Sequence, residues 1–232
     1  MNMKRRKVSA NQVARLNNLF LVILIVFELG LLSTYLITVW VWGKSPAIVD
    51  FNGFQNLPSL FSAVQLFIVA CGFMGLAFYR SYPGQKLSRR LLVTVGLILF
   101  YVAVIDETFK VHQHFYKAFC WLLIENCRSW YNIYIYLYIG IAIATLVLLF
   151  KDLKATWKFY PSAAFLVGFG IFTFLFGALG LELFKFQVFD TGYGAIEKLR
   201  IGLEEYLEML GMTLALYGVG RFFTRRISDI DS

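Results

Sequence analysis

Acidic and histidine side chains in the second half of the chain have the types and spacing that could do chemistry. Asp106 and Glu107 are followed closely by His112 and His114, the only two histidines of the protein. Imidazole and carboxylate groups projecting from several helices of a bundle are ligands with which proteins bind zinc, iron or manganese. We therefore treat these four residues as candidate ligands of a divalent metal.

Four further acids complete this candidate metal set: Glu182, Glu204, Glu205 and Glu208. On a helix, Glu197, Glu204 and Glu208 stand at i, i+7 and i+11, which places them in one stripe with Arg200 on the same face. Acids that enter a membrane must face the bundle interior, a cavity or a cation. A metal held there would activate water for attack on a lipid or another hydrophobic substrate.

Ordinary ion pairing is the alternative for part of this set. Glu107 with Lys110, and Glu197 with Arg200, are spaced as i,i+3 pairs of the kind that stabilise exposed helices. The sequence holds neither an H-E-x-x-H motif nor a paired E-x-x-H motif, so the spacing is not diagnostic of a metal site. We expect no local cation to accompany Glu204, Glu205 and Glu208 into the membrane, which leaves pairing a poorer explanation for them.

Glu28 stands alone inside a long apolar stretch near the start of the chain. A single carboxyl group in such a segment must be protonated or paired across the bundle. A proton relay is the functional interpretation, and a hydrogen bond to a neighbouring helix is the structural one.

The cysteines and glycines are better explained by structure than by chemistry. A disulfide between Cys120 and Cys127 is feasible, but on a continuous helix their Cα atoms lie roughly 10 Å apart by rise alone, too far for a bridge. We expect Cys71 to be a small core residue. A set of four glycines predicts a face for close helix packing: Gly168, Gly170, Gly177 and Gly180.

The elements that must position these residues are apolar helices. The chain is 59% hydrophobic, with a mean hydropathy of +0.67, which is far more apolar than a soluble domain. Runs that are apolar on every face exclude the alternating pattern of a membrane barrel. We expect an all-α polytopic transmembrane bundle forming one domain over residues 1–232, with about six spans near residues 18–42, 58–79, 91–116, 131–150, 161–184 and 199–223.

Charge predicts the orientation of that bundle. Of the 22 Lys and Arg residues, 15 fall in the two termini and in the second and fourth connections, so both termini should be cytoplasmic. The net charge of +8 then reflects membrane insertion and contact with anionic lipid, and we expect no nucleic-acid partner. The expected partners are the lipid bilayer and another membrane protein.

Four stretches together carry a family resemblance: FNGFQNLPSLFSA, IDETFKVHQ, FGALGLELF and LEEYLEMLG. They resemble a group of uncharacterised bacterial multispan inner-membrane proteins with an Asp-Glu-then-His helix and a Glu-Glu-x-x-Glu helix near the C-terminus. The resemblance implies an inner-membrane location and a site at the matching residues Asp106, Glu107, His112, Glu182, Glu204, Glu205 and Glu208. Gln113 and Phe54 depart from the pattern at positions where the group often has an acid, so this chain lacks two possible metal ligands of the group, which counts against an active metal centre.

Three functions remain open on the sequence. The first is a metal-binding membrane enzyme that acts on a lipidic substrate. The second is a small proton- or cation-coupled carrier in which Glu28 and Glu208 exchange charge. The third is a non-catalytic subunit or assembly factor whose aromatic residues, 18% of the chain, contact another membrane complex.

Overall fold

The computed structural model describes residues 10–51, 56–78, 87–106, 111, 133–181, 183 and 194–231. Every element within these ranges is helical, which confirms the all-α fold class. In chain order they are α1 (Ala10–Trp42), the 3-10 turn η1 (Ala47–Val49), α2 (Leu57–Phe78), α3 (Arg89–Phe100), the π-helical η2 (Tyr101–Asp106), α6 (Ile133–Leu148), α7 (Phe150–Phe159), α8 (Pro161–Leu175), the π-helical η4 (Phe176–Leu181) and α10 (Gly194–Asp231).

Local sequence explains where several helices begin and end. Gly43, at a φ of 71°, follows the last residue of α1 in the left-handed conformation that glycine tolerates best. The Ser88 side chain caps α3 by accepting a hydrogen bond from the Leu91 backbone N–H at 3.3 Å. Pro161 opens α8 at a position where its missing N–H costs nothing.

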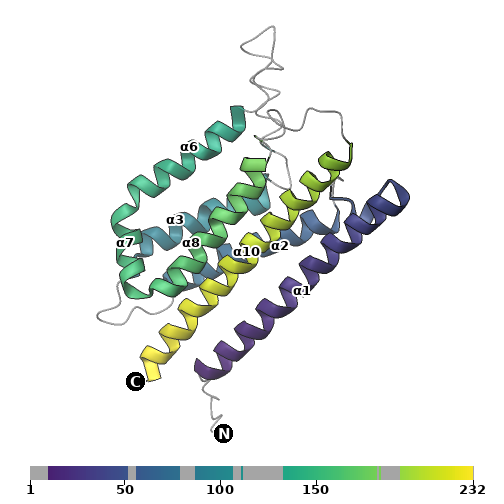
Figure 1. The fold of residues 1–232 in the computed structure, drawn as a ribbon. Helices are drawn as coiled ribbons and strands as arrows, with labels where there is room; N and C mark the ends of the chain where they lie inside the picture. The colour runs from purple at the N-terminus through teal and green to yellow at the C-terminus, as the bar shows by residue number, and fades with distance from the viewer. Residues whose placement is uncertain are drawn as a thin grey trace.

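The long helix α10 lies at the centre of the described bundle. It packs against α8, η4, α1 and α2, and α2 also packs against α3. Figure 1 shows α10 running between α1 and α8, with the start of α1 and the end of α10 at the same end of the bundle. We call this the terminal end, and the other the opposite end.

Two apolar clusters hold this arrangement together. The larger joins α2, α3, α8 and α10 through buried side chains such as Phe73, Leu99 and Met212. The smaller joins α1 to α10 and to the connection after α1, where Tyr35 stacks on Phe51 with ring centroids 4.6 Å apart. Burying these side chains supplies the apolar stabilisation that fixes α10 against its neighbours.

Glycines allow α8 and α10 to approach closely. A Cβ at Gly170 would lie 2.5 Å from both the Gly211 carbonyl oxygen and the Ala215 nitrogen, and one at Gly177 would lie 2.9 Å from the Glu204 carbonyl oxygen. The expected close packing is thus present at Gly170 and Gly177. A Cβ at Gly168 would meet nothing within 4 Å, and one at Gly180 would meet only the Phe176 ring.

Three described helices are long and apolar enough to cross a membrane: α1, α2 and the α8–η4 segment Pro161–Leu181. A fourth span results if α6 and α7 are counted together, although they meet at an angle of 67° around Leu149. The helix α3 and its π-helical extension, as well as α10, carry charged residues near their ends and do not pass this test. The described residues thus hold three or four candidate spans, and the expectation of six spans is not confirmed.

Cys71 corrects one expectation. Its side chain is exposed on α2, whereas the adjacent Ala70 is 1% exposed. Successive helix positions are rotated by about 100°, so a small residue beside a core position can still point outward. Cys71 is therefore not a core residue.

Candidate functional site: a buried carboxyl cluster

Glu28 lies at the meeting point of three helices. Along α1, Glu28, Leu31 and Tyr35 are buried in one stripe, because positions three and four apart share a helix face. That stripe packs against α10, and Glu28 also reaches Gln65 of α2, while neighbouring residues such as Phe27 and Leu29 remain exposed. The Glu28 side chain is 0% exposed.

One oxygen of Glu28 is held by two neutral donors. Gln65 on α2 donates its amide Nε2–H to Glu28 Oε1 at 2.8 Å, and Thr213 on α10 donates its hydroxyl to the same oxygen at 2.5 Å. Gln65 Nε2 also donates to Thr213 Oγ1 at 2.7 Å. The three side chains form a closed ring of hydrogen bonds that joins α1, α2 and α10.

Other oxygens at this junction remain without a hydrogen bond. Glu28 Oε2, Gln65 Oε1 and the Ser62 hydroxyl oxygen are all buried and have no hydrogen-bond partner. Ser62 stands one helical turn before Gln65 on α2 and is 5% exposed. We call Glu28, Ser62, Gln65 and Thr213 the carboxyl cluster. A buried polar group without a partner normally costs about 1–3 kcal/mol of stability. A water molecule or an ion bound to these acceptors would remove this cost.

A second group of charges lies near the start of α10. Arg200, only 4% exposed, donates from Nε and Nη2 to the two oxygens of Glu197 at 3.0 and 2.9 Å. Its Nη1 donates to Glu204 Oε2, so one guanidinium neutralises two carboxylates. We call these three residues the arginine triad. The expectation that no local cation accompanies the acids is wrong for Glu204, because Arg200 lies one turn away on the same face.

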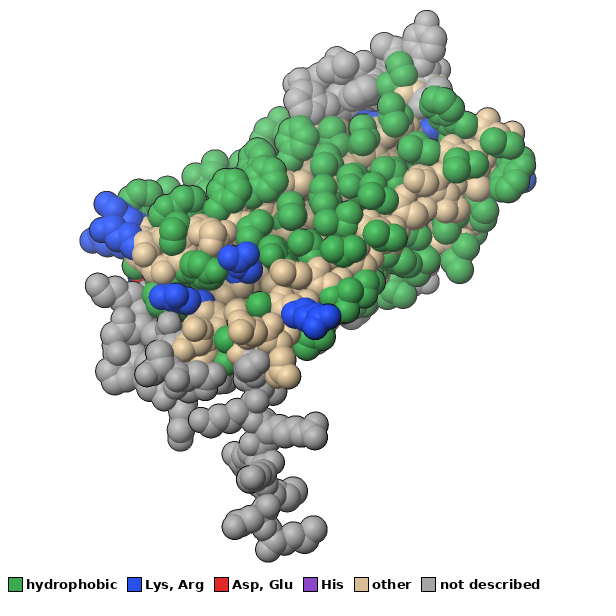
Figure 2. Space-filling model, turned by 60° about the horizontal axis from the view of Figure 1, so that its bottom comes forward, with side chains coloured by type: hydrophobic (Ala, Val, Ile, Leu, Met, Phe, Trp, Pro, Cys, Tyr) green, Lys and Arg blue, Asp and Glu red, His purple; other side chains and the backbone are tan. Residues whose placement is uncertain are grey.

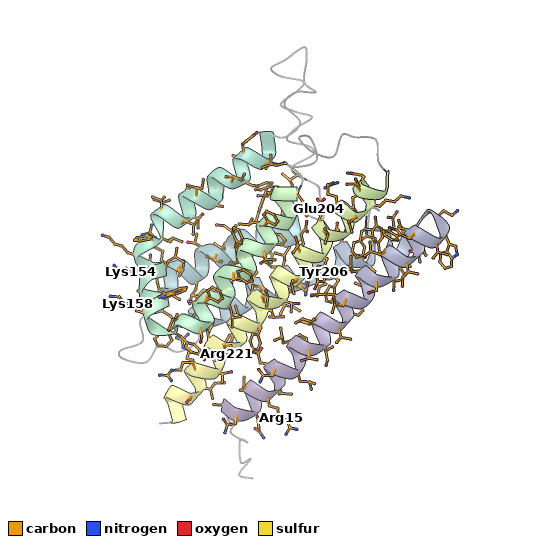
Figure 3. All side chains as sticks on the ribbon, viewed as in Figure 1. Arg15, Lys154, Lys158, Glu204, Tyr206 and Arg221 are labelled. Atoms are coloured by element: carbon orange, nitrogen blue, oxygen red, sulfur yellow. The ribbon has the colours of Figure 1, made fainter. Side chains whose placement is uncertain are left out.

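Figure 3 shows how these sites are placed along α10. Glu204 lies toward the opposite end of the bundle and Tyr206 near the middle of the molecule, whereas Arg15, Lys154, Lys158 and Arg221 lie toward the terminal end. Tyr206 lies seven residues before Thr213 and therefore on nearly the same face of α10. Glu205 and Glu208, which flank Tyr206 on the same helix, are half-buried and engaged in interactions of their own.

Asp106 ends the π-helical segment after α3. It is 7% exposed, and Tyr138 on α6 shares a hydrogen bond with it and another with Tyr101. This contact connects the first half of α6 to η2. Asp106 is therefore engaged with a tyrosine within the described part of the chain.

The other predicted site residues lie outside the described residues: Glu107, His112, His114, Glu182, Cys120 and Cys127. Within the described ranges, no group of three His, Cys, Asp or Glu side chains is placed to hold a metal ion. The predicted metal set and the predicted disulfide therefore both stay predictions.

At the terminal end, Tyr160 interacts with Arg221 of α10. The Tyr160 hydroxyl oxygen accepts hydrogen bonds from Arg221 Nη2 at 2.9 Å and Nε at 3.2 Å. Burial by itself raises the pKa of Tyr160, but the hydrogen bonds from Arg221 and Ser162 and the nearby positive charges outweigh it and lower that pKa. Tyr160 precedes α8 and lies outside the membrane-length segments.

Fold and site together define a helical protein in which membrane-length apolar helices surround a buried carboxyl group. The chain belongs to the family described as "Domain of unknown function (DUF8692)", whose sequence profile matches residues 18–220. The matched region contains the whole carboxyl cluster. No curated protein and no solved structure matches the chain.

Sequence reasoning identified Glu28 but missed the residues around it. Gln65 was the available signal, because an amide inside an apolar run needs a partner just as a carboxyl group does. Thr213 gave a weaker signal, since a helical threonine can satisfy its hydroxyl on its own backbone, as Thr173 does with the Phe169 carbonyl oxygen at 2.9 Å.

Proposed function

We propose that this chain is a multispan integral membrane protein of the bacterial inner membrane, with both termini cytoplasmic. The membrane-length helices and the resemblance to inner-membrane proteins support a membrane location. The distribution of basic residues supports the orientation: Lys and Arg gather around the terminal end, and hydrophobic side chains cover much of the remaining visible surface (Figure 2). At the other end of α1, Trp40 and Trp42 are exposed, as residues of an interfacial belt would be.

Within this architecture we infer a proton- or cation-coupled carrier in which Glu28 is the exchanging group. The observation that carries this proposal is the fully buried Glu28 carboxyl group, which only neutral donors contact. An ionised carboxylate in an apolar interior is costly unless a positive charge compensates it. Glu28 is therefore stable when it holds a proton or a cation, and losing that ion favours a different arrangement of the helices around it.

Polar side chains provide a route between Glu28 and the opposite end. Ser62 stands about 4.5 Å along α2 from Gln65, and Tyr206 about 10 Å along α10 from Thr213, both toward that end. Glu208 lies two residues after Tyr206, about 200° around α10 from it, and its backbone nitrogen is on the side that approaches Gly177, so this route does not include Glu208. Loading would then occur from the side on which α10 begins.

Infrared difference spectroscopy on the protein in lipid tests the exchange without knowledge of the cargo. The protonated carboxyl stretch of Glu28 should appear in acidic buffer and vanish in alkaline buffer. Glu28→Gln should remove this band, whereas Asp152→Asn, a matched carboxyl-to-amide change on α7, should leave it. A protonated Glu28 band that persists from acidic to alkaline buffer, with and without NaCl, would mean that the carboxyl group is a permanent structural hydrogen-bonding group, and the carrier proposal would fail.

A metal-dependent membrane enzyme acting on a lipid is the second candidate, favoured by the two π-helical segments. The segment η2 ends at Asp106 and η4 ends at Leu181, directly before Glu182, so both occur next to predicted ligands. Such segments are frequent at functional sites. Elemental analysis of the native chain, His112→Ala and Glu204→Gln tests this. Stoichiometric zinc, iron or manganese lost in both variants would support the enzyme, and metal-free native protein would exclude it.

A further inference from the structure

We propose that the carboxyl cluster is a binding site for a monovalent metal cation, with Na⁺ as the fitting ion. This inference rests on the proposed function, because it names the ion that the carrier exchanges. The ligands would be Glu28 Oε2 and Gln65 Oε1, with the Ser62 hydroxyl oxygen as a third. All three atoms are buried and without a hydrogen-bond partner.

The hydrogen-bond ring brings together the two groups that carry the main ligand atoms. Gln65 Nε2 and Glu28 Oε1 are 2.8 Å apart, and each free oxygen is bonded to the same carbon as one of these two atoms. Thr213 Oγ1 contacts both groups from the third helix, which holds the amide and the carboxyl in fixed orientations. The uncommitted oxygens therefore belong to one preorganised junction of α1, α2 and α10.

Charge balance selects a monovalent ion. The cluster contains one carboxyl group and three neutral side chains, so a single positive charge neutralises it. A divalent ion would leave an uncompensated charge among buried apolar side chains such as Met209 and Met212, which are both 0% exposed. Within the described residues, Glu28 has no ion pair with Lys or Arg that would make a bound cation unnecessary.

The ligand chemistry fits a hard cation. Carboxylate, amide carbonyl and hydroxyl oxygens are ligands for hard ions, whereas softer metals prefer imidazole or thiolate. A single water molecule is the competing occupant, since it could donate to both free acceptors. Water would give no dependence on the identity of the salt, which makes the two occupants separable.

The test is the thermal unfolding of the purified full-length chain in detergent at fixed pH. NaCl is titrated against choline chloride at constant ionic strength, and a parallel titration uses KCl. We expect the Tm to rise with Na⁺ and to saturate, because an ion that binds only the folded state stabilises it by mass action. Binding of radioactive ²²Na⁺ should reach one ion per chain over the same concentrations.

Variants assign the ion to the cluster. Glu28→Gln should abolish both the Tm rise and the ²²Na⁺ binding, while Ser62→Ala should weaken the apparent affinity about fivefold, as expected for one lost polar contact. Ser59→Ala, the same change on the same helix, should leave the affinity unchanged. Ser62→Ala and its control keep the test valid even if the Glu28 variant is poorly folded.

The outcomes separate this inference from the proposed function. A native Tm that responds equally to Na⁺, K⁺ and choline, without ²²Na⁺ binding, overturns the cation site. If the infrared band of Glu28 still titrates, the carrier proposal survives with the proton as its ion. Saturable Na⁺ binding that persists in Glu28→Gln also overturns the inference, because the ion would then bind elsewhere.

Discussion

The carboxyl cluster and the arginine triad differ in how the charge of a glutamate side chain is compensated. Glu204 and Glu197 share a guanidinium that is covalently part of the neighbouring turn, so their charge is compensated permanently. Glu28 has hydrogen bonds from an amide and a hydroxyl but no fixed positive charge within the described residues. Glu197 and Glu204 are neutralised by an arginine of their own helix, whereas the proposed compensation of Glu28 is a proton or cation that can dissociate.

This difference indicates where exchange chemistry belongs in the molecule. Arginine remains charged at every accessible pH, so the arginine triad has no reason to bind or release an ion. Its acids also remain 35% and 19% exposed, which lowers the cost of their charge. An ionised Glu28 is costly without a compensating cation, so of these two sites the carboxyl cluster is the one for which ion exchange is proposed.

The largest expected effect comes from removing the acceptor at the carboxyl cluster. Glu28→Leu leaves donors of Gln65 and Thr213 without their acceptor and should lower the free energy of unfolding by about 2–5 kcal/mol. Glu28→Gln should cost less than about 1 kcal/mol, because its oxygen keeps both hydrogen bonds and its amide can donate to Gln65 Oε1. Unfolding in mixed micelles measures both. Equal losses in the two variants would contradict the described hydrogen-bond ring.

The arginine triad should respond less strongly. Arg200→Met removes the buried cation and should cost about 1–3 kcal/mol, less than the 3–5 expected of a fully buried pair, because both acids reach solvent. Adding Glu204→Gln to this variant should restore part of the loss. A double-mutant cycle measures the coupling, and additive losses would show that the Arg200 and Glu204 side chains do not interact.

Packing of α10 should affect both sites together. Gly170→Ala and Gly211→Ala force the backbones of α8 and α10 apart and should each cost about 1–3 kcal/mol. The matched control Gly168→Ala should be neutral or stabilise by up to about 1 kcal/mol, since nothing lies within 4 Å and alanine favours the helix. The same unfolding assay applies. A loss in Gly168→Ala as large as in Gly170→Ala would contradict the close α8–α10 approach.

The smallest effect is a pH dependence at the terminal end. Because the pKa of Tyr160 is lowered on folding, the phenolate contributes stability that is present above its unfolded pKa and is lost as the pH falls through the folded pKa. Near neutral pH this contribution should be absent. Tyr160→Phe should therefore remove a small stability gain seen only in alkaline buffer, and a native-minus-variant absorbance titration should show a tyrosine that ionises early. A tyrosine that ionises at or above its ordinary pKa would refute the Arg221 contact.

Apolar runs predicted most of the helices, because membrane-length hydrophobic segments are a strong local signal. The sequence also identified Glu28, since a lone acid in such a segment needs a partner. It could not identify Gln65 and Thr213, because those contacts span 37 and 185 positions of the chain and depend on how three helices pack. The i,i+4 spacing of Arg200 and Glu204 also predicts an ion pair. From the sequence we considered only the i,i+3 pair of Glu197 with Arg200 and therefore missed it.

The helix α7 and the exposure of Cys71 escaped prediction, for different reasons. The break at Leu149 lies at the predicted end of the span near residue 150, where the charged residues Lys151 and Asp152 follow, but those residues do not indicate that a second helix begins directly after it. Cys71 lies in a helix that is apolar on all faces, where hydrophobicity does not tell the inner face from the outer one.

The π-helical turn before Asp106 accommodates one extra residue without redirecting that acid. Such a turn usually holds one residue more than a regular helical turn, so the chain after it continues on nearly the same face. Deleting one residue from Tyr101–Ile105 would restore the regular helix and leave Asp106 on the side of Tyr138. Making the turn α-helical without a deletion would instead rotate Asp106 by about 100°, one residue's step around the axis. A one-residue difference in length within this turn between family members would therefore keep the acid in place.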